Sequence, residues 1–273
     1  MKKILALILA LVMSVCALAS CGDPITYDDL MIVDLGLERE NFGIAFRAGS
    51  DMTRKVEDIT LELVNNDTLK TLGERYEVTG IIEKGNYTPK ADPCTGSTDW
   101  SYIQSKGTLV IGITDYKPMD YKDENGAWVG FDADYARAVC TALGVTPVFK
   151  EIDWDYKLIA LESKDIDCIW NGMTITDGIE AAADCTVPYM YNTQVAVIRK
   201  DDAEKYKSLS DLEGKKIAAE SGSAGEKVIQ ANEKLAKKYK AVTAQTDAIL
   251  EVMSGSSKAA IVDLTLAKAL IKN

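Results

Sequence analysis

The feature of this chain that most constrains its fold is the alternation of strand-like and helix-like segments from residue 108 onward. Residues 108–113 form a short apolar run typical of a buried strand, and residues 132–143 follow with helical periodicity. Tyr135, Val139 and Leu143 share one face of that expected helix. Repeated units of this kind predict an α/β fold with mostly parallel sheets covered by helices on both faces.

The same alternation extends toward both ends of the chain. Further strands are expected at residues 42–46, 145–149, 167–170, 194–198, 216–219 and 259–262, and further helices at 52–63 and 224–237. Residues 79–107 are punctuated by glycine and proline without clear periodicity, which predicts a long linker. No internal repeat is evident, and 273 residues suffice for one large core or two smaller ones.

The first twenty residues form a separate unit. Lys2 and Lys3 precede an apolar run over residues 4–19, which is too short and wrongly flanked for a spanning helix. The run ends in LASC at residues 18–21, which resembles the lipobox of bacterial lipoproteins. The resemblance implies a signal peptide at 1–20 and a lipid on Cys21, holding the protein at the outer face of the cytoplasmic membrane. The alternative is an ordinary secretory signal with a coincidental cysteine.

Export bears on the remaining cysteines. Outside the signal and the anchor, the chain has Cys94, Cys140, Cys168 and Cys185, an even number that allows two disulfides in an oxidising compartment. Four unpaired buried thiols are the alternative. A metal site is not expected, because the chain has neither a CxxC pair nor a histidine.

The net charge of −11 argues against nucleic acid as a partner, since phosphate binding needs clustered lysine and arginine. We interpret the acidity mainly as a contribution to solubility.

A set of short motifs then resembles one family of binding proteins. The motifs are YKDENG at 121–126, GFDADY at 130–135, DWD at 153–155, KDID at 164–167, GMTIT at 172–176, GKKI at 214–217, SGS at 221–223 and AIVD at 260–263. Their order and spacing resemble the polar amino-acid solute-binding proteins of ABC importers (family 3, which includes glutamine- and lysine/arginine/ornithine-binding proteins). This resemblance implies a two-lobed, periplasmic-binding-protein-like fold of type II.

The order of the segments departs from that family. The family continues after the last motif into a strand of the form Tyr-Gly-Ile-Ala-Phe-Arg, a helix, a polar turn and a short helix, whereas this chain stops at Asn273. Matching text lies at the other end, as FGIAFRAG at 42–49 and the segments that follow it. The simplest interpretation is a circular permutation whose linker, residues 79–107, joins the usual C-terminus to the usual N-terminus. A truncated protein preceded by a duplicated fragment is the alternative.

The permutation sets the expected domain organisation. Residues 40–198 would form the first lobe contiguously, including the linker 79–107. Residues 199–273 would form the second lobe, completed by the segment 21–39, which also includes the tether. Crossovers near Glu40 and Lys200 would then act as hinges.

The resemblance also implies a binding site between the lobes. Asp263 matches the family's ammonium-binding carboxylate, Thr174 and Gly172 match the residues that meet the ligand from the first lobe, and Trp154 and Tyr116 match its two aromatic walls. The full expected set is Asp115, Tyr116, Trp154, Asn171, Gly172, Met173, Thr174, Glu220, Ser223, Ala224 and Asp263. Each has a structural alternative: Asp263 and Thr174 could cap helices, and Trp154 could be a core residue.

One position breaks the family pattern. Ile179 stands where the family's carboxylate-binding arginine should fall. Either another cation or helix-terminal amides substitute for it, or the ligand is not a standard α-amino acid. Glu220, with Asp115 and Asp263, would make the cleft acidic and favour a cationic ligand, unless its side chain faces solvent.

The cysteines can also be placed on this fold. Cys168 lies in the strand before Trp170, and Cys185 in a segment expected to return beside it. We therefore expect a Cys168–Cys185 disulfide, which leaves Cys94 to pair with Cys140.

The function expected from these observations is that of a lipid-anchored, monomeric binding protein. It would capture a small polar solute, with an amino acid as the leading candidate, between two closing lobes. It would deliver this solute to the permease and ATPase subunits of an ABC importer, and no cofactor is expected. Two alternatives remain: a sensory module that binds a solute without transport, and a dehydratase-like enzyme on the same fold. The absence of histidine and of any nucleophile–base pair in the sequence speaks against the enzyme.

Overall fold

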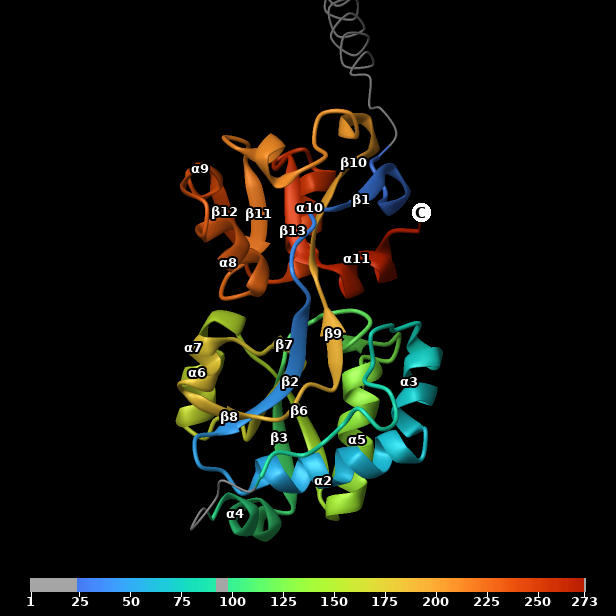
Figure 1. Ribbon diagram of the computed structural model, residues 1–273, viewed down its shortest axis with the longest axis vertical. Helices are drawn as coiled ribbons and strands as arrows, with labels where there is room; N and C mark the ends of the chain where they lie inside the picture. The colour runs from blue at the N-terminus through green and yellow to red at the C-terminus, as the bar shows by residue number, and fades with distance from the viewer. Residues whose placement is uncertain (1–23, 92–97, 273) are drawn as a thin grey trace, which may run out of the picture.

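The computed structural model describes residues 24–91 and 98–272, and within them the chain forms two lobes placed one above the other (Figure 1). The first lobe is built on a six-stranded sheet with the order β6-β3-β7-β2-β8, in which β9 also pairs with β2. Its strands are β2 (Glu40–Arg47), β3 (Thr108–Ile113), β6 (Thr146–Glu151), β7 (Cys168–Thr174), β8 (Ala183–Cys185) and β9 (Met190–Asn192). Its helices are α2 (Met52–Asn65), α3 (Thr68–Tyr76), α4 (Asp99–Lys106), α5 (Phe131–Leu143), α6 (Lys157–Glu162) and α7 (Asp177–Glu180). A small hairpin, β4 (Tyr121–Lys122) with β5 (Trp128–Val129), lies between β3 and α5.

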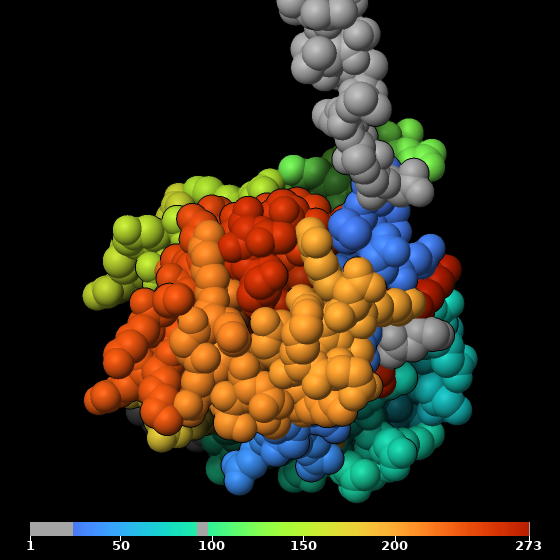
Figure 2. Space-filling model, turned by 90° about the horizontal axis from the view of Figure 1, so that it is seen from above, coloured from blue at the N-terminus to red at the C-terminus, as the bar shows by residue number. Residues whose placement is uncertain are grey.

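The second lobe contains a five-stranded sheet with the order β1-β10-β13-β11-β12. Its strands are β1 (Leu30–Asp34), β10 (Gln194–Arg199), β11 (Ile217–Glu220), β12 (Tyr239–Val242) and β13 (Ala259–Asp263). Its helices are α8 (Ala224–Gln230), α9 (Glu233–Ala236), α10 (Gln245–Met253) and α11 (Leu264–Leu270). Figure 2 looks down on this lobe and shows the blue N-terminal segment packed beside the orange and red C-terminal part.

Most of the expected strands and helices are present, but both sheets are mixed rather than mostly parallel. The expected βα units do give parallel pairs, β3 with β6 and β7, and β11 with β12 and β13. β2 and β10, however, run antiparallel to every strand they pair with. Both strands adjoin a crossover between the lobes. Each enters its sheet from the other lobe and is not part of a parallel βα unit.

Three expected boundaries also change. β10 was expected in the first lobe, but it pairs with β1 and β13 in the second. The helix expected at 224–237 is divided, because the Asn232 side chain accepts a hydrogen bond from Lys234 N (2.9 Å) and starts a new helix there. The end of the expected linker, finally, is helical and forms α4.

β2 illustrates how the sequence produces the layers of the first lobe. Its large side chains, Phe42, Ile44 and Phe46, belong to the main core together with residues of α2 and α5. Ala45 points to the opposite face, where residues of α6 and α7 pack. Alternation with period two therefore buries β2 on both faces of the sheet.

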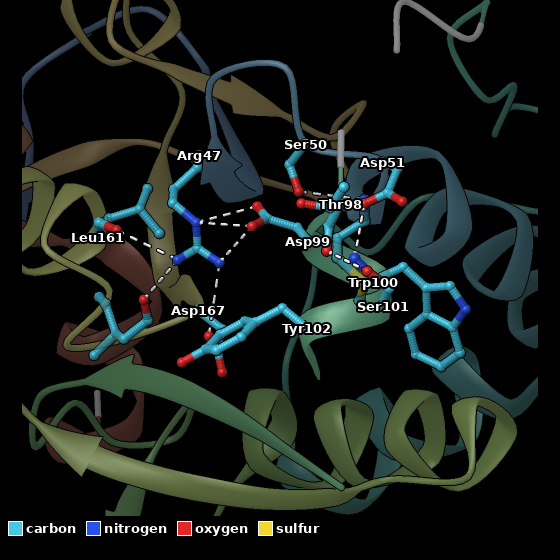
Figure 3. A network of polar contacts seen from close by, with 12 residues as sticks. Arg47, Ser50, Asp51, Thr98, Asp99, Trp100, Ser101, Tyr102, Leu161 and Asp167 are labelled. Atoms are coloured by element: carbon cyan, nitrogen blue, oxygen red, sulfur yellow. Dashed lines mark hydrogen bonds and ion pairs between the residues drawn. The ribbon is translucent and has the colours of Figure 1, made fainter. Parts of the chain in front are cut away.

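The start of β7 and the helix α4 are tied to the end of β2 by a buried ion-pair cluster (Figure 3). The Arg47 guanidinium lies 3.0 Å from a carboxylate oxygen of Asp99 at the start of α4, and 3.7 Å from one of Asp167. It also donates a hydrogen bond to the carbonyl oxygen of Ile166 (3.0 Å). The backbone N–H of Trp100 in turn donates to the Asp51 carboxylate (2.8 Å), so the chain before α2 is fixed to α4.

The expected Cys168–Cys185 disulfide is wrong, since both residues carry free thiols. β7 and β8 pair with β2 on its two opposite edges, with Cys168 beside Phe46 and Cys185 beside Ala45. Strands two positions apart in a sheet are separated by roughly 9–10 Å, beyond the reach of a disulfide. The two thiols also face different cores.

Cys140 is likewise a buried free thiol, contrary to the expected Cys94–Cys140 bridge. Cys94, like Cys21 and the expected signal peptide, lies outside the described residues.

Two crossovers connect the lobes. One is the segment 35–39 between β1 and β2, and the other is Thr193 between β9 and β10, rather than a residue near Lys200. The Thr193 hydroxyl donates hydrogen bonds to the carbonyl oxygens of Leu37 (3.3 Å) and Glu38 (3.4 Å), so the crossovers run side by side. Across the described part of the chain, no helix has the length and apolar character needed to traverse a membrane.

Candidate functional site

A narrow cavity of about 30 Å³ lies between the two lobes. It brings together residues from both sheets, and these include the expected site residues Tyr116, Trp154, Asn171, Gly172, Met173, Thr174, Glu220, Ser223, Ala224 and Asp263. Asp115 does not line the cavity; it is exposed on the loop after β3.

Asp263 lies at the end of β13 and is 4% exposed. One oxygen accepts hydrogen bonds from the side-chain amides of Asn192 (2.6 Å) and Gln194 (2.5 Å), and the other accepts from Gln245 (2.5 Å). Burial and the nearby Glu40 carboxylate raise the pKa of Asp263 to about 7, although the amide donors counteract this shift. A cationic ligand group beside Asp263 would favour the charged carboxylate.

The first-lobe side of the cavity is formed by the end of β7. Thr174 presents a half-buried hydroxyl that donates to Glu40 (3.3 Å). Gly172 has a φ of +56°, and a Cβ atom there would lie 2.6 Å from the Tyr116 ring, so glycine is required at this wall. Its N–H donates to Asp132 (2.7 Å), a buried carboxylate at the start of α5.

Ile179 is buried and lines the cavity, so the position expected for arginine presents an apolar side chain. Close to it, Lys227 reaches across from α8, and its ammonium donates to the hydroxyl of Thr176 (2.9 Å). The same hydroxyl accepts from Ile179 N (3.4 Å) and caps α7. A cation from the opposite lobe therefore lies near the place where arginine is missing.

The start of α8 forms the facing wall. Ser223 caps the helix by accepting from Glu226 N (3.2 Å), and the Glu226 side chain accepts from Gly222 N (2.6 Å). These backbone donors are already used within the helix start, so the capping interpretation of Ser223 holds. Gly222 has a φ of +72°, and a Cβ atom there would lie 2.9 Å from the Cα of Asp155 in the first lobe. The two lobes are therefore in close contact at this glycine.

Trp154 lines the cavity and is 6% exposed, but its ring already faces a cation of the protein itself. The Lys157 ammonium lies 4.7 Å from the ring centroid. Opposite, Glu220 ends β11 and is 3% exposed. Sequence reasoning identified Trp154 and Glu220, whereas it missed Lys157, Lys227, Gln245 and Glu40.

The missed residues carry different amounts of sequence signal. Lys157 stands two residues after the DWD motif, at the start of an otherwise apolar segment, where a lysine is unusual enough to notice. Lys227, one helical turn after Ser223, could have been found by asking which cation replaces an arginine at position 179. Gln245 reaches the cavity only through tertiary packing, and Glu40 contacts the lining residue Thr174 without lining the cavity itself. No motif marks either residue.

Comparison with known proteins identifies the family. The model of the bacterial extracellular solute-binding proteins, family 3, matches residues 109–263, which is more than half of the chain. The chain belongs to this family. Among curated relatives, the L-cystine-binding protein TcyJ of Escherichia coli (strain K12) is 30% identical over 131 residues, or 48% of this chain and 49% of TcyJ. The arginine-binding extracellular protein ArtP of Bacillus subtilis (strain 168) is 29% identical over 183 residues, covering 65% of this chain and 69% of ArtP.

Solved structures agree with this membership. The arginine-bound truncated ArgBP from T. maritima is 34% identical, with a TM-score of 0.59, covering 62% of this chain and 79% of that one. A substrate-binding protein of an ABC uptake transporter from Streptococcus pneumoniae, with bound histidine, is 29% identical at a TM-score of 0.60, covering 64% of this chain and 73% of that one. The fold is therefore periplasmic-binding-protein-like, with two mixed sheets. The chain spans about half the length of TcyJ.

Proposed function

We propose that this protein captures an α-amino acid between its two lobes and delivers it to an ABC importer. The observation that carries the proposal is that Asp263 and Thr174 face one cavity from opposite lobes. The ligand ammonium would bind the Asp263 carboxylate. The ligand carboxylate would accept from the Lys227 ammonium and would replace Glu40 as the acceptor of the Thr174 hydroxyl. Charge-assisted bonds of this kind strengthen when the closed lobes exclude water.

Closure would couple binding to transport. A ligand held by residues of both lobes has a higher affinity for the closed arrangement, and it therefore shifts the population toward it. The paired crossovers at 35–39 and Thr193 are the segments that would absorb the rotation. The permease would then recognise the closed form.

The relatives support an amino acid as the ligand. Arginine, cystine and histidine appear in the names of binding proteins similar to this chain. We transfer the class of ligand from them, not any one of these amino acids, because Ile179 and the second-lobe cation Lys227 make the site differ from a standard arginine clamp.

The location follows from the N-terminal motif. We infer that cleavage before Cys21 leaves a lipid-anchored protein at the outer face of the cytoplasmic membrane, with residues 22 and 23 starting a tether. An exported position fits the family's extracellular description.

We also infer that the domain order is circularly permuted. β1 and β2 precede the family-matched segment 109–263, yet they occupy positions in the second and the first sheet. The solved relatives extend beyond their matched part, which covers 79% of the ArgBP chain. Both facts support the view that residues 25–76 supply the elements that follow β13 in other members.

Calorimetric titration tests the proposed function. The protein is titrated with the common L-amino acids, L-cystine and putrescine, and we expect one-to-one binding of at least one amino acid. Asp263→Asn should weaken that binding at least about tenfold, because it removes a charged acceptor for the ammonium. The exposed Asp28→Asn in the same lobe is the matched control and should bind normally. A folded protein that binds no amino acid would refute the proposal.

A further inference from the structure

Lys157 is a cation built into the wall of the cavity. Its side chain is nearly inaccessible at 7% exposure, and its ammonium donates to two carbonyl oxygens, those of Trp154 (2.9 Å) and Gly222 (2.9 Å). Because Gly222 belongs to the second lobe, this lysine bonds across the cleft. Burial lowers the pKa of Lys157 to about 8, a shift that the Glu220 carboxylate partly opposes, so the ammonium remains mostly charged at neutral pH.

The position of this ammonium changes what Trp154 can bind. An aromatic face is a good platform for a ligand cation when it is free. Here the Lys157 ammonium lies 4.7 Å from the ring centroid, so a guanidinium or ammonium from the ligand would meet a like charge in a dry site. The ammonium has three donors, and two are directed at the carbonyls named above. The third is the one it can offer to a molecule in the cavity.

Glu220 provides the complementary group from the second lobe. It lines the same cavity, is 3% exposed, and its Oε1 has no hydrogen-bond partner among the described residues. Burial first, and the Asp263 carboxylate second, raise the pKa of Glu220 well above its usual range. A buried carboxylate oxygen without a donor is unfavourable, so a ligand that supplies a donor there is strongly preferred.

We propose that Lys157 and Glu220 together form the side-chain subsite of the cavity, which selects a ligand side chain that both accepts and donates hydrogen bonds. The lysine offers one donor and the glutamate one acceptor, from opposite lobes. A carboxamide, a ureido group or a second ammonium–carboxylate head satisfies both at once. A purely cationic side chain would donate to Glu220 but would be repelled by Lys157. A purely anionic side chain would accept from Lys157 but would be repelled by Glu220.

This inference rests on the proposed function, because it assigns the ligand's ammonium to Asp263 and its side chain to the remaining polar pair. It separates this protein from the arginine-binding relatives. Specificity arises here from a repulsive element, Lys157, as much as from an attractive one.

Matched ligand pairs test the subsite by calorimetry on the intact protein. L-Citrulline and L-arginine differ in a ureido against a guanidinium group, and L-glutamine and L-glutamate differ in an amide against a carboxylate. We expect citrulline to bind more tightly than arginine, and glutamine more tightly than glutamate. The comparison is made within each pair whose members bind measurably. The expected ratio within a pair is roughly tenfold or more, since one member leaves a buried polar group unpaired.

Two variants should then change these ratios in opposite directions. Lys157→Met should remove or reverse the preference against arginine, and Glu220→Gln should remove the preference against glutamate. Lys240→Met, an exposed lysine on β12, is the control and should leave both ratios unchanged. Each ratio is measured within one variant, so partial loss of stability does not affect it.

The outcomes distinguish the two proposals. If arginine binds more tightly than citrulline and Lys157→Met leaves the ratio as it is, the subsite is refuted while amino-acid capture stands. If no amino acid, including those of both pairs and L-cystine, binds to the folded protein, amino-acid capture itself is refuted and the subsite with it.

Discussion

At the scale of single residues, the most unusual feature is the number of carboxyl groups buried in and under the cavity. The carboxyl groups of Asp120 and Asp132 interact electrostatically, and both are buried. Asp132 accepts hydrogen bonds from Gly172 N (2.7 Å) and the Tyr189 hydroxyl (2.8 Å), whereas neither carboxyl oxygen of Asp120 has a partner in the described structure. Burial and the Asp132 charge therefore favour the neutral form of Asp120.

This pair should make stability depend on pH. Burial raises the pKa of Asp132 to about 7, and burial with the Asp132 charge raises the pKa of Asp120 well above its usual range. A carboxyl group with a raised pKa in the folded state binds more protons there than in the unfolded state, so stability falls as pH rises from about 4 through 7. Asp263 and Glu220, whose pKa values are also raised by burial, contribute to the same fall. Urea unfolding between pH 5 and 7.5 should show the fall.

Asp120→Asn isolates the contribution of the pair. We expect its free energy of unfolding to fall less between pH 5 and 7.5 than that of the unchanged protein, since one of the carboxyl groups with a raised pKa is gone. The exposed Asp28→Asn should retain the full slope. An Asp120→Asn protein with the unchanged slope would show that the pair does not titrate in this range.

At the scale of elements, the loop between β11 and α8 controls how closely the lobes approach. Gly222 in that loop lies against Asp155 of the first lobe, and its carbonyl accepts from Lys157. Gly222→Ala would place a methyl group 2.9 Å from the Asp155 Cα atom. We expect ligand affinity to fall roughly tenfold, because an overpacked contact costs about 1–3 kcal/mol and here opposes closure.

Gly214→Ala is the matched control for that change. Gly214 is in the same lobe with a φ of +70°, close to the +72° of Gly222, but a Cβ atom there meets nothing within 4 Å. Both variants should lose similar stability through backbone strain. Calorimetry and unfolding measured together separate the effects, and equal losses of affinity in both variants would contradict a role for the Gly222 contact.

The elements also show which inferences a sequence supports. Periodicity predicted β2, β3, α2 and α5 well, because their side chains alternate between core and solvent, or between two cores, over several residues. It did not predict that β2 and β10 would be antiparallel, since strand direction depends on where the crossovers lie. The Cys168–Cys185 pairing failed for the same reason: adjacency to a common neighbour, β2, was mistaken for adjacency to each other.

For the cavity, motifs predicted the residues near strand ends, while cross-lobe partners were missed. Thr174 and Asp263 are the last residues of β7 and β13, so their positions are set by the fold. Lys157, Lys227 and Gln245 all reach the cavity from helices, so their roles depend on the relative placement of the lobes. The relative placement of the lobes is a property of the folded molecule, and no local sequence pattern predicts it.

At the scale of the whole molecule, the proposed permutation predicts that the chain can be reopened at its linker. A chain that begins at residue 98, ends at residue 91 and joins residue 272 to residue 24 by a short flexible linker would restore the usual order. Figures 1 and 2 show the C-terminal end beside the N-terminal segment of the second lobe, so a short join suffices. The Arg47–Asp99 ion pair and the bond from Trp100 N to Asp51 would hold the new N-terminal helix α4 in place.

We expect the reopened chain to keep its circular dichroism spectrum and to bind the same amino acid within about threefold, because no strand or described helix is cut. A second chain opened between Ala45 and Phe46, within β2, is the control and should not fold, since that strand pairs with β7 and β8 in the centre of the first lobe. Failure of the reopened chain alone would mean that the linker contributes to the fold, not merely to its connectivity. The two ends of residues 79–107 would then not be the natural termini of the family, and the interpretation as a simple permutation would be wrong.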